Sequence, residues 1–305
     1  MQHPYLHARF STIQPDKKMS DFCLLVSDLH GKVNRYEKLF AYLEEQKPST
    51  LFIGGDILPS SVLHSFRAGE IKPDFVSDYL ATRFEELRVK LGKKYPRVFI
   101  IMGNDDPKIE EETLIEFEKQ GLWEYIHGKV VPLGQFQVMG YSYVPPTPFL
   151  LKDWERYDTD HTVQPGCMKP EDGFRTFHTK ENEFKITISE DLEKLSGSID
   201  PARTICLFHS PPYHTGLDRV AMDGISVENS QADIFVGSKA ISSFIENYKP
   251  LLTLHGHIHE SSRLTGVWKE MEDKTVSISA AYEGPGLAVI KFHLSAPFDA
   301  ERIIL

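Results

Sequence analysis

The chain has no apolar run that approaches the roughly 20 residues needed to cross a membrane as a helix, so we expect no membrane span. Its first twenty residues are polar and are interrupted by Pro4 and Pro15. They lack the basic start and the apolar stretch of a secretory signal. We therefore expect residues 1–20 to form an exposed N-terminal arm on a single domain that spans residues 1–305; packing of the arm against the body is the alternative.

Cysteine is scarce, because the 305 residues include only Cys23, Cys167 and Cys206 and no Cys-x-x-Cys pair. An odd and sparse set predicts no disulfide framework, and the lack of paired thiols argues against a structural zinc finger. Cys23 and Cys206 lie in apolar stretches, where a free thiol behaves as a small hydrophobe. This usage fits a reducing compartment, and we expect a cytoplasmic protein.

Positive charge is also in short supply, since 34 Lys and Arg residues against 44 Asp and Glu residues give a formal net charge of −10. An acidic chain lacks the electrostatic footprint of a general nucleic-acid binder, so we expect no nucleic-acid partner.

The sequence contains neither a Gly-x-Ser-x-Gly elbow nor a glycine-rich loop that cradles phosphate. It does contain enough apolar residues, 41% of the chain, to fill a substantial core.

Five short apolar runs are each followed by Asp, Asn or His, usually beside glycine; they cover residues 23–26, 51–53, 98–102, 205–208 and 251–254. Runs this short that are apolar on both faces are typical of fully buried strands. Between them, apolar residues three and four apart predict three helices. The first ends near Pro48, the second covers residues 74–91 and ends near Gly92, and the third ends near Pro250. Asn34 and Glu37 resemble a capping box for the first helix. The alternation predicts an α/β fold with a largely parallel core.

Two parts of the chain depart from this alternation. Residues 275–278 and 287–294 have the pattern of two strands around Gly284-Pro285-Gly286, and we expect them to form an antiparallel pair. Residues 144–180 are rich in proline, aromatic and charged residues and show no clear period. A segment of this length inside a compact domain is often a lid or a binding loop. A solvated insertion or a subunit contact is an equally weighted alternative.

The polar residues at the ends of the predicted strands carry the chemistry. The carboxyl ends of strands in an α/β sheet meet at one edge, where ligands bind, so residues far apart in sequence can share one site. Each group alone is ordinary turn chemistry. Turn chemistry alone does not explain why five strand ends all offer oxygen or imidazole donors. These donors are Asp28, His30, Asp56, Asn104, His209, His257 and His259.

In order along the chain, these groups resemble the signature of the calcineurin-like metallophosphoesterases, D-x-H, G-D, G-N-H-D/E, H and G-H-x-H, over residues 28–259. Residues 209–218 are similar to cytosolic prokaryote-type members. The resemblance implies a four-layer α/β/β/α sandwich with two central mixed sheets. It also implies hydrolysis of phosphate esters by attack of a metal-bridging hydroxide on phosphorus. We expect a small phosphoester substrate, with phosphodiesters favoured over monoesters, and leave the oligomeric state open.

The resemblance further implies a division of ligands between two metal ions, divalent or of mixed valence. Asp28, His30 and His259 would hold the first ion, and Asn104, His209 and His257 would hold the second. Asp56 would bridge the two ions, and we count Asp56 and Asn104 among the catalytic residues as well. Carboxylate, amide and imidazole ligands without thiolate suit Mn²⁺, Fe or Zn²⁺.

The sequence departs from the family at Asp105, which stands where the signature has a histidine that assists the transition state. Near pH 7 an aspartate is normally ionised and repels an anionic substrate rather than donating a proton to it. His214 is therefore a substitute proton donor to test, with His161 and His178 behind it. Arg156 and Arg219 are candidate phosphate clamps, although surface ion pairs are slightly favoured for both. We expect His255 to be packed or to support a ligand, and Glu260 to lie at the surface. Asp106 either orients a neighbour or caps the segment that starts at Pro107, and capping is favoured.

Two other functions remain open at this point. A non-catalytic interaction protein of the same fold is mildly favoured by Asp105, whereas the full ligand set argues against it. A nuclease could use the same fold, whereas the net charge of −10 disfavours a long anionic polymer.

Overall fold

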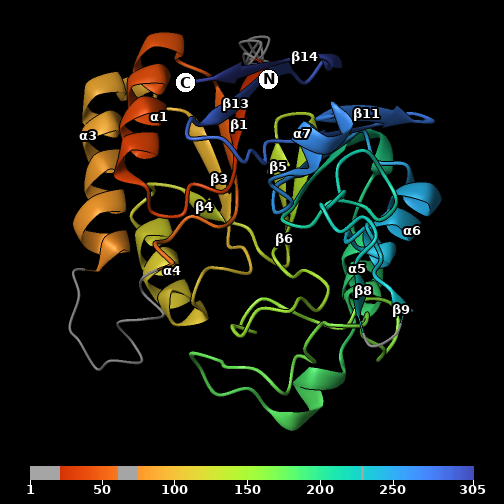
Figure 1. Ribbon diagram of the computed structural model, residues 1–305. Helices are drawn as coiled ribbons and strands as arrows, with labels where there is room; N and C mark the ends of the chain where they lie inside the picture. Colours follow the sequence, from red (N-terminus) through yellow and green to blue (C-terminus); the bar gives the residue numbers. More distant parts are fainter. Residues whose placement is uncertain (1–20, 61–73, 228–229) are drawn as a thin grey trace, which may run out of the picture.

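The computed structural model describes residues 21–60, 74–227 and 230–305 of the chain. The expected N-terminal arm, residues 1–20, lies outside the described residues. Figure 1 shows two sheets side by side, with helices on their outer faces. This arrangement confirms the expected α/β sandwich of four layers with two mixed sheets.

The first sheet has six strands in the order β14-β13-β1-β2-β3-β4. Strands β1 to β4 run parallel to one another, while β13 is antiparallel to both β1 and β14. The bounds are β1 Phe22–Val26, β2 Thr50–Gly54, β3 Arg97–Ile101, β4 Glu124–Tyr125, β13 Ala288–His293 and β14 Ala296–Ile304.

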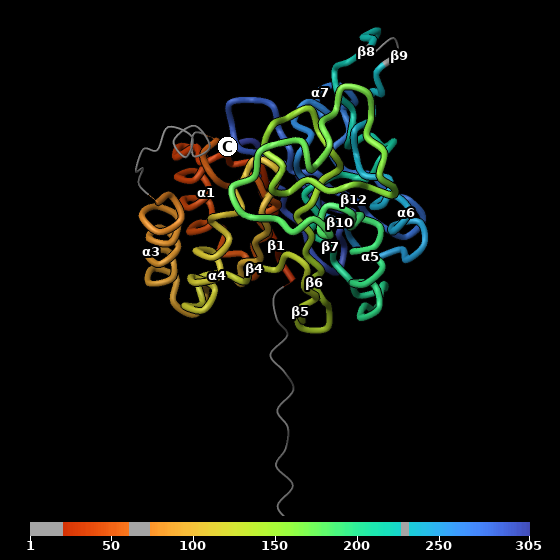
Figure 2. The backbone as a smooth tube through the Cα atoms, turned by 90° about the horizontal axis from the view of Figure 1, so that it is seen from below, coloured from red at the N-terminus to blue at the C-terminus, as the bar shows by residue number. Residues whose placement is uncertain are grey.

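The second sheet also has six strands, in the order β11-β12-β10-β7-β6-β5. Strands β12, β10, β7 and β6 are parallel, and the edge strands β11 and β5 are antiparallel to their neighbours. The bounds are β5 Lys129–Leu133, β6 Phe136–Tyr141, β7 Thr204–Phe208, β10 Leu252–His255, β11 Lys269–Glu272 and β12 Thr275–Ser279. A separate small hairpin pairs β8 Ser226–Val227 with β9 Ser230–Gln231, and Figure 2 shows it projecting from the body.

Alternate residues of the central strands enter two different layers of the core, as the two-residue period of a strand requires. Cys23 and Leu25 of β1 belong to an apolar cluster that includes residues from both sheets, whereas Leu24 and Val26 belong to the cluster that includes the helices. Between the sheets, the ring of Phe52 stacks on Phe99 at a centroid distance of 5.5 Å. Burial on both faces explains why these strands read as continuous apolar runs.

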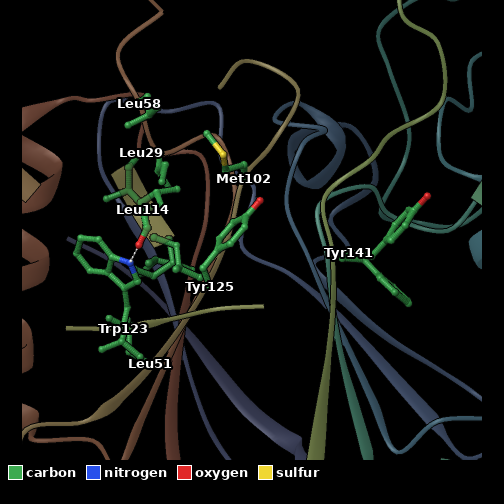
Figure 3. Close-up of a cluster of buried hydrophobic side chains, with 14 of the residues drawn as sticks. Leu29, Leu51, Leu58, Met102, Leu114, Trp123, Tyr125 and Tyr141 are labelled. Carbon is green, nitrogen blue, oxygen red and sulfur yellow. Dashed lines mark hydrogen bonds between the residues drawn. The ribbon is translucent and has the colours of Figure 1, made fainter. Parts of the chain in front are cut away.

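The helices cover the outer faces of the sheets. Helices α1 (Val33–Gln46), α3 (Thr82–Leu91) and α4 (Glu111–Lys119) lie beside the first sheet, and α5 (Ile188–Ser196) and α6 (Lys239–Tyr248) lie beside the second (Figure 1). Figure 3 shows the apolar cluster near α4, where the indole Nε1 of Trp123 donates to the carbonyl of Leu114 at 2.9 Å. The remaining helical turns are short: η2 Gly92–Lys94, η3 Lys108–Glu110, η4 Glu181–Lys185, η5 Pro201–Arg203 and α7 Ser261–Thr265.

All three predicted helices are present, with two differences in detail. The predicted helix over 74–91 begins as a π-helix, η1 (Phe75–Ala81), with the Asp74 carboxylate accepting from the amides of Val76 and Ser77, and continues as α3. The capping box predicted at Asn34 is wrong. The N-cap of helix α1 is Lys32, two residues before Asn34, and it makes no side-chain capping hydrogen bond. Asn34 therefore already lies in the first turn.

The expected antiparallel pairing of the last two predicted strands is also wrong. Strand β12 joins the second sheet parallel to β10, and β13 joins the first sheet antiparallel to β1. The Gly284-Pro285-Gly286 segment therefore connects the two sheets rather than turning a hairpin. Each strand has its antiparallel partner elsewhere, β11 for β12 and β14 for β13.

The segment 144–180 is irregular, as expected, and only part of it is solvated. Its first part contains Lys152, Asp153 and Trp154, none of which exposes any surface, whereas residues 159–162 are exposed. Isolated bridges connect Val144 to Glu155 and Leu151 to Phe174.

Among the residues that the structure describes, no helix is both long and apolar enough to cross a membrane.

Candidate metal centre

The predicted ligands all follow strands whose carboxyl ends meet at one edge of the sandwich. Hydrogen bonds between the loops hold them together: the amide of Asp28 donates to Gly55 at 3.0 Å, that of His30 to Asp56 at 2.7 Å, and that of Gly256 to His209 at 3.0 Å. The third of these bonds joins two loops of the second sheet. The first two join the loops after β1 and β2 of the first sheet. The amide of His257 donates to Asp28 Oδ1 at 3.0 Å and so links the loops of the two sheets.

Four of the side chains form one group in which the ligand atoms lie within 4.8 Å of one another; they are Asp28, His30, Asp56 and His259. The Nε2 atoms of His30 and His259 are 3.2 Å apart. His259 Nε2 also lies 3.3 Å from Asp28 Oδ1, and His30 Nε2 lies 3.9 Å from Asp56 Oδ2. Imidazole nitrogens and carboxylate oxygens thus face a common centre, which is an arrangement that can hold a metal ion.

A second group consists of Asp56, His209 and His257. His209 Nε2 lies 3.4 Å from Asp56 Oδ2 and 3.2 Å from the amide oxygen of Asn104. Its other nitrogen, Nδ1, lies 2.7 Å from the carbonyl of Gly54. Because a carbonyl can only accept, Nδ1 carries a proton, and Nε2 is the nitrogen that can bind a metal ion. Asp56 belongs to both groups.

The backbone at this edge is held in a conformation that L-residues seldom adopt. Asp28, His30, Asp56 and His257 have φ values of 59°, 50°, 52° and 74°. Non-glycine residues in the left-handed region cost free energy and gather at functional sites. Four of the eight described non-glycine residues with positive φ are thus candidate ligands.

Glycine is required where these loops approach one another. A Cβ on Gly55, which has a φ of +95°, would lie 2.6 Å from His209 Nδ1. A Cβ on Gly103 would lie 2.3 Å from Asp56 Oδ1. The glycines in the Gly-Gly-Asp and Gly-Asn-Asp motifs therefore make room for the candidate ligands themselves.

Burial and charge at the centre both suit a cation. Asp28 Oδ2 is buried and has no hydrogen-bond partner among the described residues, a costly state unless another group coordinates it. Burial raises the pKa of the Asp28 carboxyl, yet His259 beside it outweighs this and holds the pKa at about 2. Burial lowers the pKa of His209, but Asp56 outweighs it and raises the pKa to about 9. The carboxylates thus favour positive charge here.

Asp105 does not turn away from the centre. Its carboxylate lies 3.2 Å from His30 Nδ1 and accepts a hydrogen bond of 2.7 Å from the hydroxyl of Ser60. Its backbone amide donates to Asp56 Oδ1 at 2.8 Å. The residue that replaces the family histidine therefore orients one candidate ligand through its side chain and another through its backbone.

The role predicted for Asp106, capping of the segment at Pro107, is wrong. Its buried carboxylate accepts from the backbone amides of Ile57 at 3.1 Å, Leu58 at 2.7 Å and Gly103 at 2.8 Å. It thereby ties the loop after β2 to the loop after β3. Pro107 itself occupies the N-cap of the short helix η3.

The other candidate residues lie away from the centre or at its margin. His214 is exposed, its ring packs against Phe235, and it does not line the cavity described below. His161 and His178 are exposed as well. Arg156 pairs with Asp191 and Arg219 with Asp223. His255 is buried, as expected, and bonds to Ser210 and Thr253.

A cavity of about 700 Å³ opens over the centre. Among the candidate ligands, His30, Asp56, Asn104, His257 and His259 line it. Residues of the 144–180 segment form one wall, and Val220, Met222, Val236 and Gly237 contribute to another. Glu260, expected at the surface, is half-buried and lines the cavity as well.

Sequence reasoning missed Arg35, whose guanidinium supports the site. Its Nη1 donates to the carbonyl of Asp28 at 2.6 Å and its Nη2 to the carbonyl of Gly284 at 2.8 Å. Arg35 lies in a helix among other charged residues, so no local signal distinguishes it. It also missed Asp158, which accepts from Ser238 and from the first amides of α6 and lines the cavity.

Comparison with known proteins agrees with this geometry. A sequence model described as calcineurin-like phosphoesterase matches residues 23–261. No curated protein matches the chain in sequence.

Among solved structures, one crystal structure shares 17% identity and a TM-score of 0.58, covering 94% of this chain and 99% of the other. The TT1561 protein of Thermus thermophilus shares 14% identity and a TM-score of 0.52, with 93% and 99% covered. A dimetal phosphatase from Danio rerio is more distant, at 12% identity and a TM-score of 0.49, with 94% and 99% covered. The first two likenesses show that the fold is shared.

Proposed function

Because the chain belongs to the calcineurin-like phosphoesterase family, a family of metal-dependent phosphoester hydrolases, we propose that it is a phosphodiesterase acting on small substrates. The single observation that carries the proposal is the buried cluster of carboxylates and imidazoles beneath a cavity, with Asp28 Oδ2 left without a partner. A buried, unpartnered carboxylate oxygen among histidines fits a bound divalent cation.

The division of ligands follows the two groups. Asp28, His30 and His259 would hold one ion, and His209 and His257 would hold the other together with the amide oxygen of Asn104. Asp56 would be shared, which is supported by its place in both groups. Nitrogen and oxygen donors without thiolate suit Mn²⁺, Fe or Zn²⁺.

Two bound cations would supply positive charge beside the phosphate and a water of lowered pKa. The residues of the chain prepare the place where this chemistry occurs. Gly54 fixes the proton of His209 on Nδ1, and Asp105 does the same for His30, so that both Nε2 atoms face the centre. Asp106 fixes the distance between the loops that carry Asp56 and Asn104.

A diester is supported over a monoester by the charges that line the cavity. A phosphate monoester carries nearly two negative charges at neutral pH, because its second pKa is about 6, whereas a diester carries one. The lining contains the carboxylates of Asp105 and Glu260 beside the candidate ligands. Each extra substrate charge would meet this repulsion, so the monoanion is favoured.

The three free cysteines support a reducing, cytoplasmic location.

One observation favours a different function. Asp105 replaces the family histidine, and no other histidine outside the candidate ligands lines the cavity in the described part of the chain. An interaction protein of this fold has no need of a proton donor. It equally has no need of a buried, strained set of metal-binding side chains, so we rank this function second. A nuclease is disfavoured by the net charge of −10 and the sparse cationic lining.

The test is hydrolysis of bis-p-nitrophenyl phosphate and p-nitrophenyl phosphate after chelation and again with added Mn²⁺. We expect metal to restore activity, with the diester hydrolysed faster. Asn104→Ala should lower kcat by about 100-fold or more. Asn34→Ala, an exposed asparagine on α1, is the matched control and should not change it.

Two outcomes would contradict the proposal. Absence of hydrolysis despite bound metal confirmed by elemental analysis would favour an interaction protein. Faster hydrolysis of the monoester would retain the hydrolase and overturn the diester preference.

A further inference from the structure

The cavity is much larger than a phosphate group and its walls are chemically uneven. We propose that it binds phosphodiesters with one bulky, largely apolar organic group that carries no negative charge. This inference rests on the proposed function and adds the class of substrate to it. It depends on wall residues that take no part in the candidate metal centre.

The size of the cavity sets the scale of the ligand. A volume of about 700 Å³ lies within the range of roughly 300–1,000 Å³ that is typical of sites for drug-sized molecules. A phosphate with two small substituents would leave most of this space to water. The geometry therefore favours an organic group that extends well beyond the phosphorus.

Apolar side chains from separate parts of the chain line the walls. The segment after β6 contributes Pro145, Pro146, Pro148 and Phe149, and a second part of the lining contains Val220, Met222 and Val236. Phe149 exposes 60% of its surface although it is a large aromatic residue. Burial of an apolar group against such walls contributes about 25 cal/mol per Å² removed from water. An alkyl or aromatic substituent gains this free energy, whereas a small polar one does not.

The charges on the walls select against a second anionic group. Among the described lining residues, Lys239 is the only lysine or arginine, and its Nζ lies 4.9 Å from the centroid of the Tyr213 ring. Asp160 and Glu260 place carboxylates on the same lining. A substrate with a second phosphate or a carboxylate would meet these groups with little cationic compensation. Neutral and cationic substituents avoid that repulsion.

Hydrogen bonds from buried residues hold the proline-rich wall in place, which argues for a preformed site. The amide and hydroxyl of Thr147 both donate to the carboxylate of Glu155, at 2.7 and 2.5 Å. Lys152 Nζ donates to the carbonyl of Thr147 at 2.7 Å and lies 2.5 Å from Glu155 Oε2. Lys152 and Glu155 are buried. A fixed wall favours one shape of ligand and lowers the entropy lost on binding.

The experiment compares p-nitrophenyl diesters that differ only in their second group, methyl, octyl or ω-carboxyheptyl, with the Mn²⁺-loaded protein. In each reaction water adds to phosphorus, p-nitrophenolate leaves, and the alkyl phosphate remains. Since the leaving group is constant, differences in kcat/KM report the second group. We expect the octyl diester to exceed the methyl diester by about 30-fold or more, because several methylenes become buried. The carboxyheptyl diester should fall at least about tenfold below the octyl diester.

Wall variants locate the effect. Met222→Ser should reduce the octyl-to-methyl ratio of kcat/KM about tenfold by replacing an apolar lining group. Met271→Ser, at an exposed methionine of β11, is the matched control and should leave the ratio unchanged. Asp160→Asn should raise the carboxyheptyl-to-octyl ratio several-fold, because it removes one carboxylate from the lining.

The outcomes separate this inference from the proposed function. If none of the three diesters is hydrolysed with metal present, the proposed function fails. If all three are hydrolysed with equal kcat/KM, the phosphodiesterase stands and the inference about its substrate is overturned. A ratio that responds equally to Met222→Ser and Met271→Ser would also overturn it.

Discussion

The carboxylate of Asp105 lies 3.2 Å from Nδ1 of His30, whose Nε2 faces the candidate metal centre. A carboxylate on one imidazole nitrogen fixes the tautomer of the ring and increases the basicity of the other nitrogen. Asp105 thus takes a supporting role at a position where the family signature has a histidine. The candidate ligands are all present, while the residue at the accessory position differs.

We predict that Asp105→Ala weakens metal binding about 10- to 100-fold, because His30 loses the partner that orients it. Asp105→Asn should keep most of the affinity, since its amide oxygen can still accept from Nδ1 of His30. Metal titration of the chelated protein, followed by elemental analysis, measures both effects. Asp299→Ala, at an exposed position, is the control. Equal affinity in Asp105→Ala and the parent protein would remove the supporting role.

Removal of metal should lower the melting temperature by several degrees. A ligand that binds only the folded state stabilises it by about 4 kcal/mol when its concentration is 1,000 times the Kd. Calorimetry with EDTA and with Mn²⁺ measures the shift. Asp28→Ala should shrink this shift, because it deletes the unpartnered buried oxygen along with the carboxylate. A full shift in Asp28→Ala would show that Asp28 is not a ligand.

Asp106→Ala should destabilise the fold by about 2–4 kcal/mol, because three backbone amides lose a buried acceptor. Asp106→Asn should lose less, since its amide oxygen still accepts from part of this set. Urea unfolding monitored by circular dichroism gives the free energies. An Asp106→Ala protein as stable as its parent would mean that water replaces the carboxylate.

The buried pair of Lys152 and Glu155 gives a prediction about the cavity wall. Lys152→Met should cost about 3–5 kcal/mol, because it leaves the Glu155 carboxylate buried without its cation. The double variant Lys152→Met/Glu155→Gln should recover much of this loss, since no net charge is then buried and Thr147 keeps an acceptor. Urea unfolding of the three proteins provides the comparison. A double variant no better than the single one would mean that the wall depends on the ion pair itself.

Much of the fold was predictable because its signals are local. The five buried strands and three helices follow from apolar runs and spacing, and all are present. The convergence of the candidate ligands was also predictable, because parallel strands end at one edge. Each of these inferences needs only a few neighbouring residues and the geometry of a sheet.

The features that sequence reasoning missed depend on distant partners. The acceptor role of Asp106 toward Ile57 and Leu58 spans residues far apart in the chain, whereas a cap at Pro107 was the local alternative. Strands β12 and β13 are both largely buried and fit either sheet, so their pattern does not reveal that they separate. In sequence, Arg35 looks like any other charged residue of a helix. Its supporting role depends on the carbonyl of Gly284, which is distant in the chain.

The position of β13 between β1 and β14 has a consequence for how the protein is made. Strand β1 (Phe22–Val26) leaves the ribosome long before β13 (Ala288–His293), the neighbour that covers one of its edges. Until then a buried, apolar strand presents unpaired backbone groups, which are a template for wrong pairing with other chains. Slow elongation should therefore increase the demand of this protein for chaperones.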